Sequence, residues 1–511
     1  MQINNQNEIE VGKKIFKSNF LLDIDEMPNI RIKKIVLSNF KSIKHGEISF
    51  YPDNSFDIND PTSNIIGLYG QNGSGKTSVI DALSILKYTM SSKSVPKYYS
   101  SCIDKNTEYS TLSFTFDLVY KNSKKEEIDY IFSIKKIKDI KENGEVTKKS
   151  FIIDRFYWED FIDENSVIDE KIVIFNEVIK VAEYKDNKKG KKQVIFDTSY
   201  EDVPFGPKVK FKEFIKNDKK FLMELAGEKR LSFEKSQSFL FSKKITDYYQ
   251  SIREKNNLSC SIIEALNCYA GVYLIVIDSQ SLLRNRYMGQ ILFWPLGLFP
   301  IGFLESTLPN FKDEKLNKEL DLFFSDYFRS VLDSVSLIIE QIIPGLKLKF
   351  QIKLVEEVKN IKLSCVRDGV EMPLDYESDG IKKLVSFIYS YIIAYGNSSV
   401  MLAIDEVDSG IFEYLLGELF EIFQEKGKGQ LIFTSHNLRP LEVLDKDSII
   451  FTTANPENRF CSLKGSFKNR TLREAYFREI VLGEQDETFY TKTKSFKIAD
   501  AMRNIGNIKY E

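Results

Sequence analysis

The sequence predicts an α/β fold in which a parallel sheet is split by a large mixed α+β insertion. An apolar run at residues 64–69 is followed by a glycine-rich turn and by a helical pattern at 76–88. A second alternation predicts a helix at 380–395, a strand at 400–404, a helix at 411–424 and strands at 430–434 and 448–452. Neither half alone supplies enough strands for a covered parallel sheet, so we expect one domain built from both.

The region between the two halves has a different pattern. Tyr, Phe, Ile and Val alternate with Lys and Glu over about 109–196, which predicts an antiparallel meander, and 212–267 and 315–343 are predicted to be helical. Short strands are also expected at 32–37 and 48–50. The expected boundaries are 1–120 for the first half, 121–345 for the insertion, 346–455 for the second half and 456–511 for a helical tail.

Composition excludes several classes of protein. Among 511 residues, 42% are hydrophobic and 13% aromatic, which excludes a disordered chain. Lys and Arg (72) nearly balance Asp and Glu (74), so any contact with nucleic acid must come from local patches. The five cysteines form no C-x-x-C pair, and neither a signal-peptide pattern nor a run of membrane-spanning length is present. We therefore expect a cytoplasmic protein with no membrane segment.

The glycine-rich turn carries the strongest motif. Residues 70–77 read G-Q-N-G-S-G-K-T and match the phosphate-loop pattern G-x-x-x-x-G-K-[ST]. Backbone N–H groups at such a helix start converge on phosphate, the lysine reaches the β/γ oxygens and the threonine hydroxyl can ligate magnesium. The alternative is a plain strand-to-helix turn. The predicted phosphate-contacting residues are Asn72, Gly73, Ser74, Gly75, Lys76, Thr77 and Ser78.

Two later strands end in residues that suit phosphate chemistry. Asp405 and Glu406 follow the strand at 400–404, where Asp405 can hold magnesium through water and Glu406 can orient or deprotonate the attacking water. His436, one of only two histidines, follows the next strand and can contact the γ-phosphate or the water. The alternatives are a buried strand with an acidic turn after it and a structural histidine.

A third candidate site precedes the helix at 380–395. Ser378 and Gly380 at a helix start combine a hydroxyl, backbone N–H groups and the positive end of the helix dipole, which together can bind an anion. Taken alone, this pattern is more typical of ordinary helix capping. Its place about twenty-five residues before Asp405 favours a functional role.

In this order the motifs resemble those of the ABC-type heads of P-loop NTPases, in the branch with SMC, RecF and OLD-like proteins. Residues 35–42, I-V-L-S-N-F-K-S, also look like the first strands of that branch. The resemblance implies ATP and Mg²⁺ as cofactors, Thr77 and Asp405 at the metal, Glu406 as catalytic base and His436 as γ-phosphate sensor.

The same resemblance implies an assembly. Ser378 and Gly380 would contact the nucleotide of a second subunit, and Asp408 and Ser409 occupy the D-loop position, so a homodimer or higher oligomer is expected. The signature here reads Ser-Asp-Gly where the family has Ser-Gly-Gly. Gln280 is the candidate for the Q-loop, with a surface loop glutamine as its alternative.

The tail carries a narrower resemblance. Residues 469–485, N-R-T-L-R-E-A-Y-F-R-E-I-V-L-G-E-Q, look like the C-terminal segment of ATPases in bacterial Septu (PtuA-like) and retron-associated antiphage systems. That resemblance implies an HNH-type nuclease as partner, with nucleic acid contacted through the complex. The alternative is a helix that packs against the head.

Three functions are weighed. The first is a regulatory ATPase that controls a partner nuclease, because the insertion contains no histidine and no second catalytic centre is found. The second is a DNA-repair ATPase of the SMC and RecF kind that clamps DNA itself, which predicts long heptad arms or a basic groove. Its best signal is a basic cluster made of Lys185, Lys188, Lys189, Lys191 and Lys192. The third, a transporter ATPase subunit, is disfavoured by the large insertion.

Overall fold

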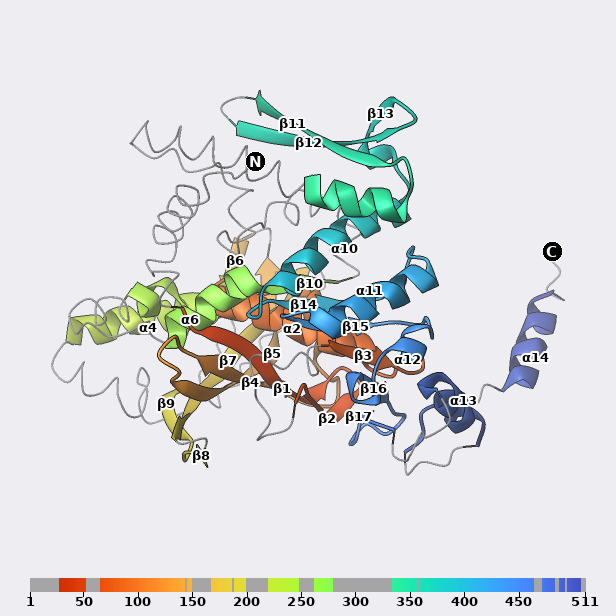
Figure 1. The fold of residues 1–511 in the computed structure, drawn as a ribbon. Coiled ribbons are helices and arrows are strands. Elements are labelled where there is room, and N and C mark those ends of the chain that lie inside the picture. The colour runs from red at the N-terminus through yellow and green to blue at the C-terminus, as the bar shows by residue number, and fades with distance from the viewer. Residues whose placement is uncertain are drawn as a thin grey trace.

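The computed structural model describes most of the two α/β halves and parts of the region between them. The described residues are 27–51, 65–142, 145–148, 167–185, 188–198, 219–247, 262–278, 333–355, 358–463, 471–482, 487–491 and 494–506. They form three β-sheets with helices around them (Figure 1). Within these ranges, no helix combines the length and the apolar character needed to cross a membrane.

The six-stranded sheet is the parallel sheet that the sequence predicts. Its order is β10-β14-β15-β3-β16-β17, and all neighbours are parallel except the last pair. The bounds are β3 (Ile65–Tyr69), β10 (Leu274–Ile277), β14 (Met401–Ile404), β15 (Gln430–Thr434), β16 (Ile449–Thr452) and β17 (Phe460–Cys461). Every residue of β3, β14, β15 and β16 is buried, as parallel strands covered on both faces require.

Strand β10 is not predicted from the sequence. It lies within the segment assigned to the insertion and pairs in parallel with β14, with Ile277 opposite Ile404. Four apolar residues directly after a helix are too few for periodicity to separate a strand from a helix end. The sheet therefore draws a strand from between its two halves, and the residues that follow β10 and β14 lie side by side.

The predicted helices around this sheet are present, with ends that differ from prediction by one or two residues. Helix α2 (Lys76–Met90) starts at the glycine-rich turn and packs against β10, β14 and β15. Helix α10 (Asp379–Gly396) packs against β14. The third is α11 (Glu413–Lys426). A short helix that the sequence does not predict, α12 (Pro440–Val443), follows β15. Helix α11 begins two residues later than predicted because 407–410 form a turn.

The predicted meander forms most of an eight-stranded antiparallel sheet. The order is β2-β1-β4-β5-β7-β8, with β6 on β5 and β9 on β7. The strands are β1 (Asn29–Phe40), β2 (Ile43–Ser49), β4 (Tyr109–Val119), β5 (Lys125–Glu142), β6 (Glu145–Lys148), β7 (Val167–Lys185), β8 (Lys188–Lys189) and β9 (Gln193–Asp197). The two expected short strands near the amino terminus thus join the meander, and β1 pairs with both β2 and β4.

The remaining described elements are helical, apart from a small antiparallel sheet β11-β12-β13 that the sequence does not predict. Its strands are β11 (Lys347–Val355), β12 (Val358–Arg367) and β13 (Val370–Pro373). The helices are α4 (Lys219–Glu234), residues 243–247, α6 (Ile262–Cys268), the π-helix η4 (Tyr269–Tyr273), residues 333–342, α13 (Leu472–Leu482) and α14 (Ser495–Gly506). The 3-10 turns are η3 (Lys97–Cys102), η6 (Leu374–Tyr376) and η7 (Lys446–Ser448).

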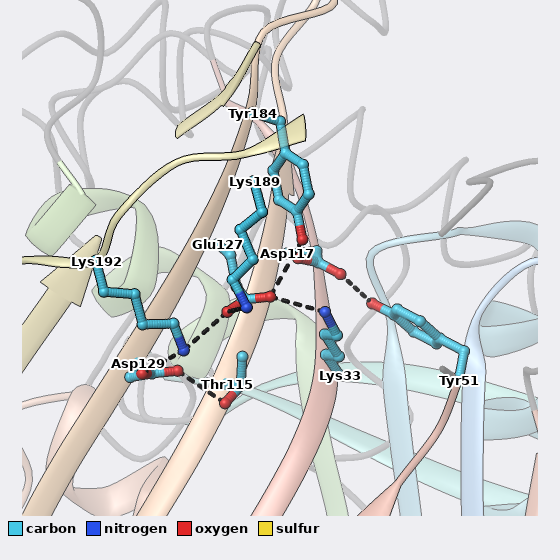
Figure 2. Close-up of polar contacts among 9 residues, drawn as sticks. All are labelled: Lys33, Tyr51, Thr115, Asp117, Glu127, Asp129, Tyr184, Lys189 and Lys192. Carbon is cyan, nitrogen blue, oxygen red and sulfur yellow. Dashed lines mark hydrogen bonds and ion pairs between the residues drawn. The ribbon is translucent and has the colours of Figure 1, made fainter. Parts of the chain in front are cut away.

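A network of charged side chains, partly buried, lies on the antiparallel sheet (Figure 2). Glu127 on β5 is only 1% exposed and pairs with Lys33 at 2.7 Å, Lys189 at 2.6 Å and Lys192 at 2.8 Å. Lys192 also pairs with Asp129 at 2.5 Å. Burial alone would raise the pKa of Glu127, but the three lysines outweigh it and lower the pKa to about 2. The network fastens the β8–β9 segment to β1 and β5.

Candidate active site

The turn between β3 and α2 forms a tight loop at the carboxyl edge of the parallel sheet. Gly70, Gly73 and Gly75 have φ angles of 151°, 78° and 99°. A Cβ atom at Gly70 would lie 1.9 Å from Thr452 Oγ1, so only glycine is accommodated there. Helix α2 has no side-chain cap and no acidic residue in its first turn. The loop therefore ends in uncapped helical N–H groups, an arrangement that favours an anion.

Hydroxyl groups hold the base of this loop. Ser74 Oγ donates to the Gln71 carbonyl at 2.5 Å and hydrogen-bonds Thr452 Oγ1, which contacts the Tyr69 carbonyl at 3.1 Å. No motif in the sequence marks Thr452; the only signal for it is a threonine at the end of a parallel strand. Across the predicted phosphate-contacting residues, Asn72 and Gly73 are exposed, Thr77 is half-buried, and Ser74, Gly75, Lys76 and Ser78 are buried.

Lys76 places a positive charge beside the carboxylates that follow β14. Its Nζ atom donates to the Gly70 carbonyl at 2.7 Å. Burial lowers the pKa of Lys76, and the charges of Asp405, Glu406 and Asp408 partly oppose this. The phosphate loop and the acidic strand end thus share one electrostatic environment.

Thr77 and Asp405, the predicted metal-site pair, are in contact. Thr77 Oγ1 lies 3.2 Å from Asp405 Oδ1, and Asp405 is 2% exposed. Thr434, the last residue of β15, donates to the same carboxylate oxygen at 2.7 Å. Because β15 lies between β3 and β14, its end is the natural place for a residue that connects the two. Thr434 is therefore a site residue that the sequence analysis does not assign.

Glu406 is exposed and has an unusual backbone. Its φ angle is 48°, in the left-handed region that non-glycine residues rarely adopt. Its N–H donates to Thr434 Oγ1 at 2.7 Å. Backbone strain of this kind persists only where surrounding contacts hold it, and it is concentrated at functional sites.

His436 lies on the loop after β15 and its side chain is exposed. The loop is held by Asp408, whose Oδ2 accepts hydrogen bonds from the N–H groups of His436 at 3.1 Å and Asn437 at 3.0 Å. Asp408 therefore links the loop after β14 to the loop that carries His436.

Ser378 and Gly380 lie at the start of α10. Ser378 is exposed and caps the helix by accepting a hydrogen bond from the Ile381 N–H at 3.4 Å. A Cβ atom at Gly380 would lie 2.8 Å from the Gly410 carbonyl oxygen, so the helix start contacts the loop after β14 within one chain. Gln280, the Q-loop candidate, lies outside the described residues.

The site as a whole follows from strand order. β3, β15 and β14 are adjacent and parallel, so the loops after them meet at one edge of the sheet. This edge brings together the phosphate loop, Asp405, Glu406 and the loop of His436. A glycine-rich loop with its lysine and threonine, joined to an acidic strand end, defines a P-loop ATPase.

Comparison with known proteins gives the family. The chain belongs to the AAA domain family, whose model matches residues 34–359. It is an ATPase, and the family implies ATP and typically Mg²⁺ as cofactors. No curated protein matches the chain.

Several solved structures are similar to this chain at low identity. One is the Smc head domain of Pyrococcus furiosus with an extended coiled coil, bound to the C-terminal domain of ScpA (14% identity, 93% of this chain and 100% of that chain, TM-score 0.40). Another is the SMC head domain from Thermotoga maritima (14% identity, 85% of this chain and 100% of that chain, TM-score 0.32). A third is the recombination mediator protein RecF-ATPrS (12% identity, 86% of this chain and 99% of that chain, TM-score 0.34).

Proposed function

We propose that this protein is a regulatory ATPase of bacterial antiphage defence, which forms nucleotide-sandwich dimers and controls an HNH-type partner nuclease. The observation that carries the ATP-dependent part is the hydrogen-bonded group formed by Thr77, Asp405 and Thr434. This group joins the phosphate loop to the acidic strand end. The dimer and the nuclease partner rest on the motif order and on the tail.

The phosphate loop would bind the triphosphate. The N–H groups from Asn72 to Ser78 and the uncapped start of α2 favour the β-phosphate, and Lys76 would exchange its contact with the Gly70 carbonyl for β/γ oxygens. The oxygens of Thr77 and Asp405 converge within 3.2 Å and are the hard ligands that Mg²⁺ prefers. When bound there, the ion neutralises phosphate charge.

Glu406 and His436 would complete the site from its exposed side. In this proposal Glu406 orients the attacking water and accepts its proton, while His436 contacts the γ-phosphate. Thr434 supports the arrangement because it hydrogen-bonds both the Asp405 carboxylate and the Glu406 N–H. One threonine thereby fixes the metal ligand relative to the base.

Two substitutions test these roles. Lys76→Ala removes the cation of the phosphate loop and should abolish binding of fluorescently labelled ATP. Glu406→Gln keeps the shape of the side chain but cannot accept a proton, so it should retain ATP while hydrolysis, measured by phosphate release, slows by about 10²–10⁴-fold. Undiminished ATP binding by the first variant, or wild-type turnover by the second, contradicts the assignment.

Exposed aromatic side chains support the dimer proposal. Tyr376 is 80% exposed and lies two residues before Ser378, while Phe412 (69%) and Tyr414 (54%) follow the Gly410 turn. Aromatic residues are enriched in protein interfaces. The Gly380–Gly410 contact brings these two exposed segments together, so a second subunit would meet them on one surface.

The helical tail supports a partner protein. Phe477, Val481 and Leu482 on α13 are 45–63% exposed, and Phe496 and Met502 on α14 are 67% and 68% exposed. Apolar side chains at this density on consecutive helices are typical of a protein-binding segment. We propose that the tail binds the nuclease.

The competing proposal is an SMC- or RecF-like ATPase that clamps DNA itself. The basic cluster predicted from the sequence gives it little support, because Lys189 and Lys192 pair with Glu127 and Asp129 (Figure 2). Lysines neutralised in this way contribute little to phosphate binding. An HNH nuclease in the neighbouring reading frame that co-elutes with this protein supports the first proposal. Tight ATP-dependent binding of duplex DNA by the protein alone supports the second.

A further inference from the structure

The strained peptide of Glu406 is held from both sides. The Glu406 N–H donates a hydrogen bond to Thr434 Oγ1. The Glu406 carbonyl oxygen accepts two hydrogen bonds. One comes from the Ser409 N–H at 3.0 Å, within the same turn. The other comes from Lys383 Nζ at 2.6 Å. Among Thr434, Ser409 and Lys383, only Lys383 lies on α10, the helix that Ser378 caps.

Lys383 lies in the second turn of α10 and reaches back over the acidic loop. Burial lowers the pKa of its amine, while the charges of Asp408, Glu406 and Asp405 oppose this. A long side chain in this position loses rotamer freedom, and the short hydrogen bond to the Glu406 carbonyl compensates for that loss.

The start of α10 cannot move without disturbing the same loop. Gly380 and Gly410 are so close that a Cβ atom on Gly410 would lie 2.9 Å from Gly380 Cα. Gly410 also has a φ angle of 82°, which favours glycine. The helix and the loop after β14 are therefore coupled at two places, by backbone contact and through Lys383.

We infer that Lys383 is a positioning residue for hydrolysis, which transmits the position of the Ser378 helix to the Glu406 peptide. This inference rests on the proposed function, in which Glu406 is the base and Ser378 meets the nucleotide of a second subunit. When that contact shifts α10, the Lys383 amine shifts with it and moves the Glu406 carbonyl. The occupancy of one nucleotide site is thereby communicated to the base of the other.

The test compares two substitutions. Lys383→Met keeps the length of the side chain but removes its charge and its donor, whereas Lys383→Arg keeps a positive charge and N–H donors. Lys426→Met on the exposed end of α11 is the matched control. Because a displaced base costs chemistry and not binding, kcat for ATP should fall about 10- to 100-fold in Lys383→Met. KM and ATP affinity should stay within about threefold of wild type. Lys383→Arg should recover most of kcat, and Lys426→Met should match wild type.

A double variant shows whether Lys383 acts through Glu406. Adding Lys383→Met to Glu406→Gln should cause no further loss, because the positioned group has already been removed. Unchanged kcat in a folded Lys383→Met variant, a change confined to KM, or a full additional loss in the double variant overturns the inference. If Lys383→Met does not fold, the Lys383→Arg and Lys383→Gln pair provides the same comparison. Wild-type hydrolysis by Glu406→Gln would instead refute the proposed function.

Discussion

The charged network around Glu127 allows a quantitative prediction about stability. The pKa of Glu127 falls from an ordinary 4.5 to about 2 in the folded protein. A carboxyl whose pKa is lowered by folding stabilises the protein above pH 4.5, and this contribution is lost as the pH falls towards about 2. The shift corresponds to about 3 kcal/mol in the free energy of unfolding. Removal of one partner from a buried ion pair typically costs about 3–5 kcal/mol, which agrees.

The substitution that tests this is Glu127→Gln, followed by urea unfolding with circular dichroism at pH 7 and at pH 2.5. We expect the variant to be about 3 kcal/mol less stable than wild type at pH 7. The difference should shrink at pH 2.5, where the carboxyl is protonated in the unfolded chain and most of the stabilisation from its lowered pKa is lost. Glu47→Gln is the control, because the Glu47–Lys34 pair is 45% and 35% exposed and should contribute less than about 1 kcal/mol. An equal loss in both variants, or a difference independent of pH, refutes the reasoning.

Two further predictions concern the nucleotide site. Ser378→Arg places a bulky charge at the exposed start of α10 and should abolish ATP-dependent dimerisation in light-scattering measurements, and a mass that responds to ATP as in wild type would exclude Ser378 from the contact. Gly70→Ala forces a Cβ atom to within 1.9 Å of Thr452 Oγ1, so the phosphate loop must distort and ATP affinity should fall at least tenfold, or about 1.4 kcal/mol. Unchanged affinity in calorimetry would show that the Thr452 contact does not shape the loop.

The parts predicted well from the sequence are those with local signals. The phosphate loop, Asp405 and the strand that precedes it follow from short patterns whose chemistry is fixed by residue type. The fully buried strands β14 and β15 lie between clear turns, so their ends differ from prediction by at most one residue. The contact of Thr77 with Asp405 then follows from parallel strands that end at the same edge.

The parts that were missed depend on contacts between distant segments. Thr434 and Thr452 look like ordinary strand residues until the sheet order places each beside the phosphate loop or the acidic strand end. Lys383 belongs to a helix whose sequence pattern predicts packing and gives no target for its amine. Strand β10 is too short for its periodicity to be diagnostic. In each case the tertiary neighbour, which single-sequence patterns do not contain, determines the role.

The strand order of the parallel sheet has a consequence for biosynthesis. β3 emerges early from the ribosome, yet its two hydrogen-bonding neighbours, β15 and β16, lie more than 350 residues later in the chain. Closing so long a loop is slow, and a nascent chain that ends before β15 leaves both edges of β3 unpaired. Incomplete translation products therefore lack a formed catalytic centre, and they expose an apolar strand that chaperones and proteases can recognise.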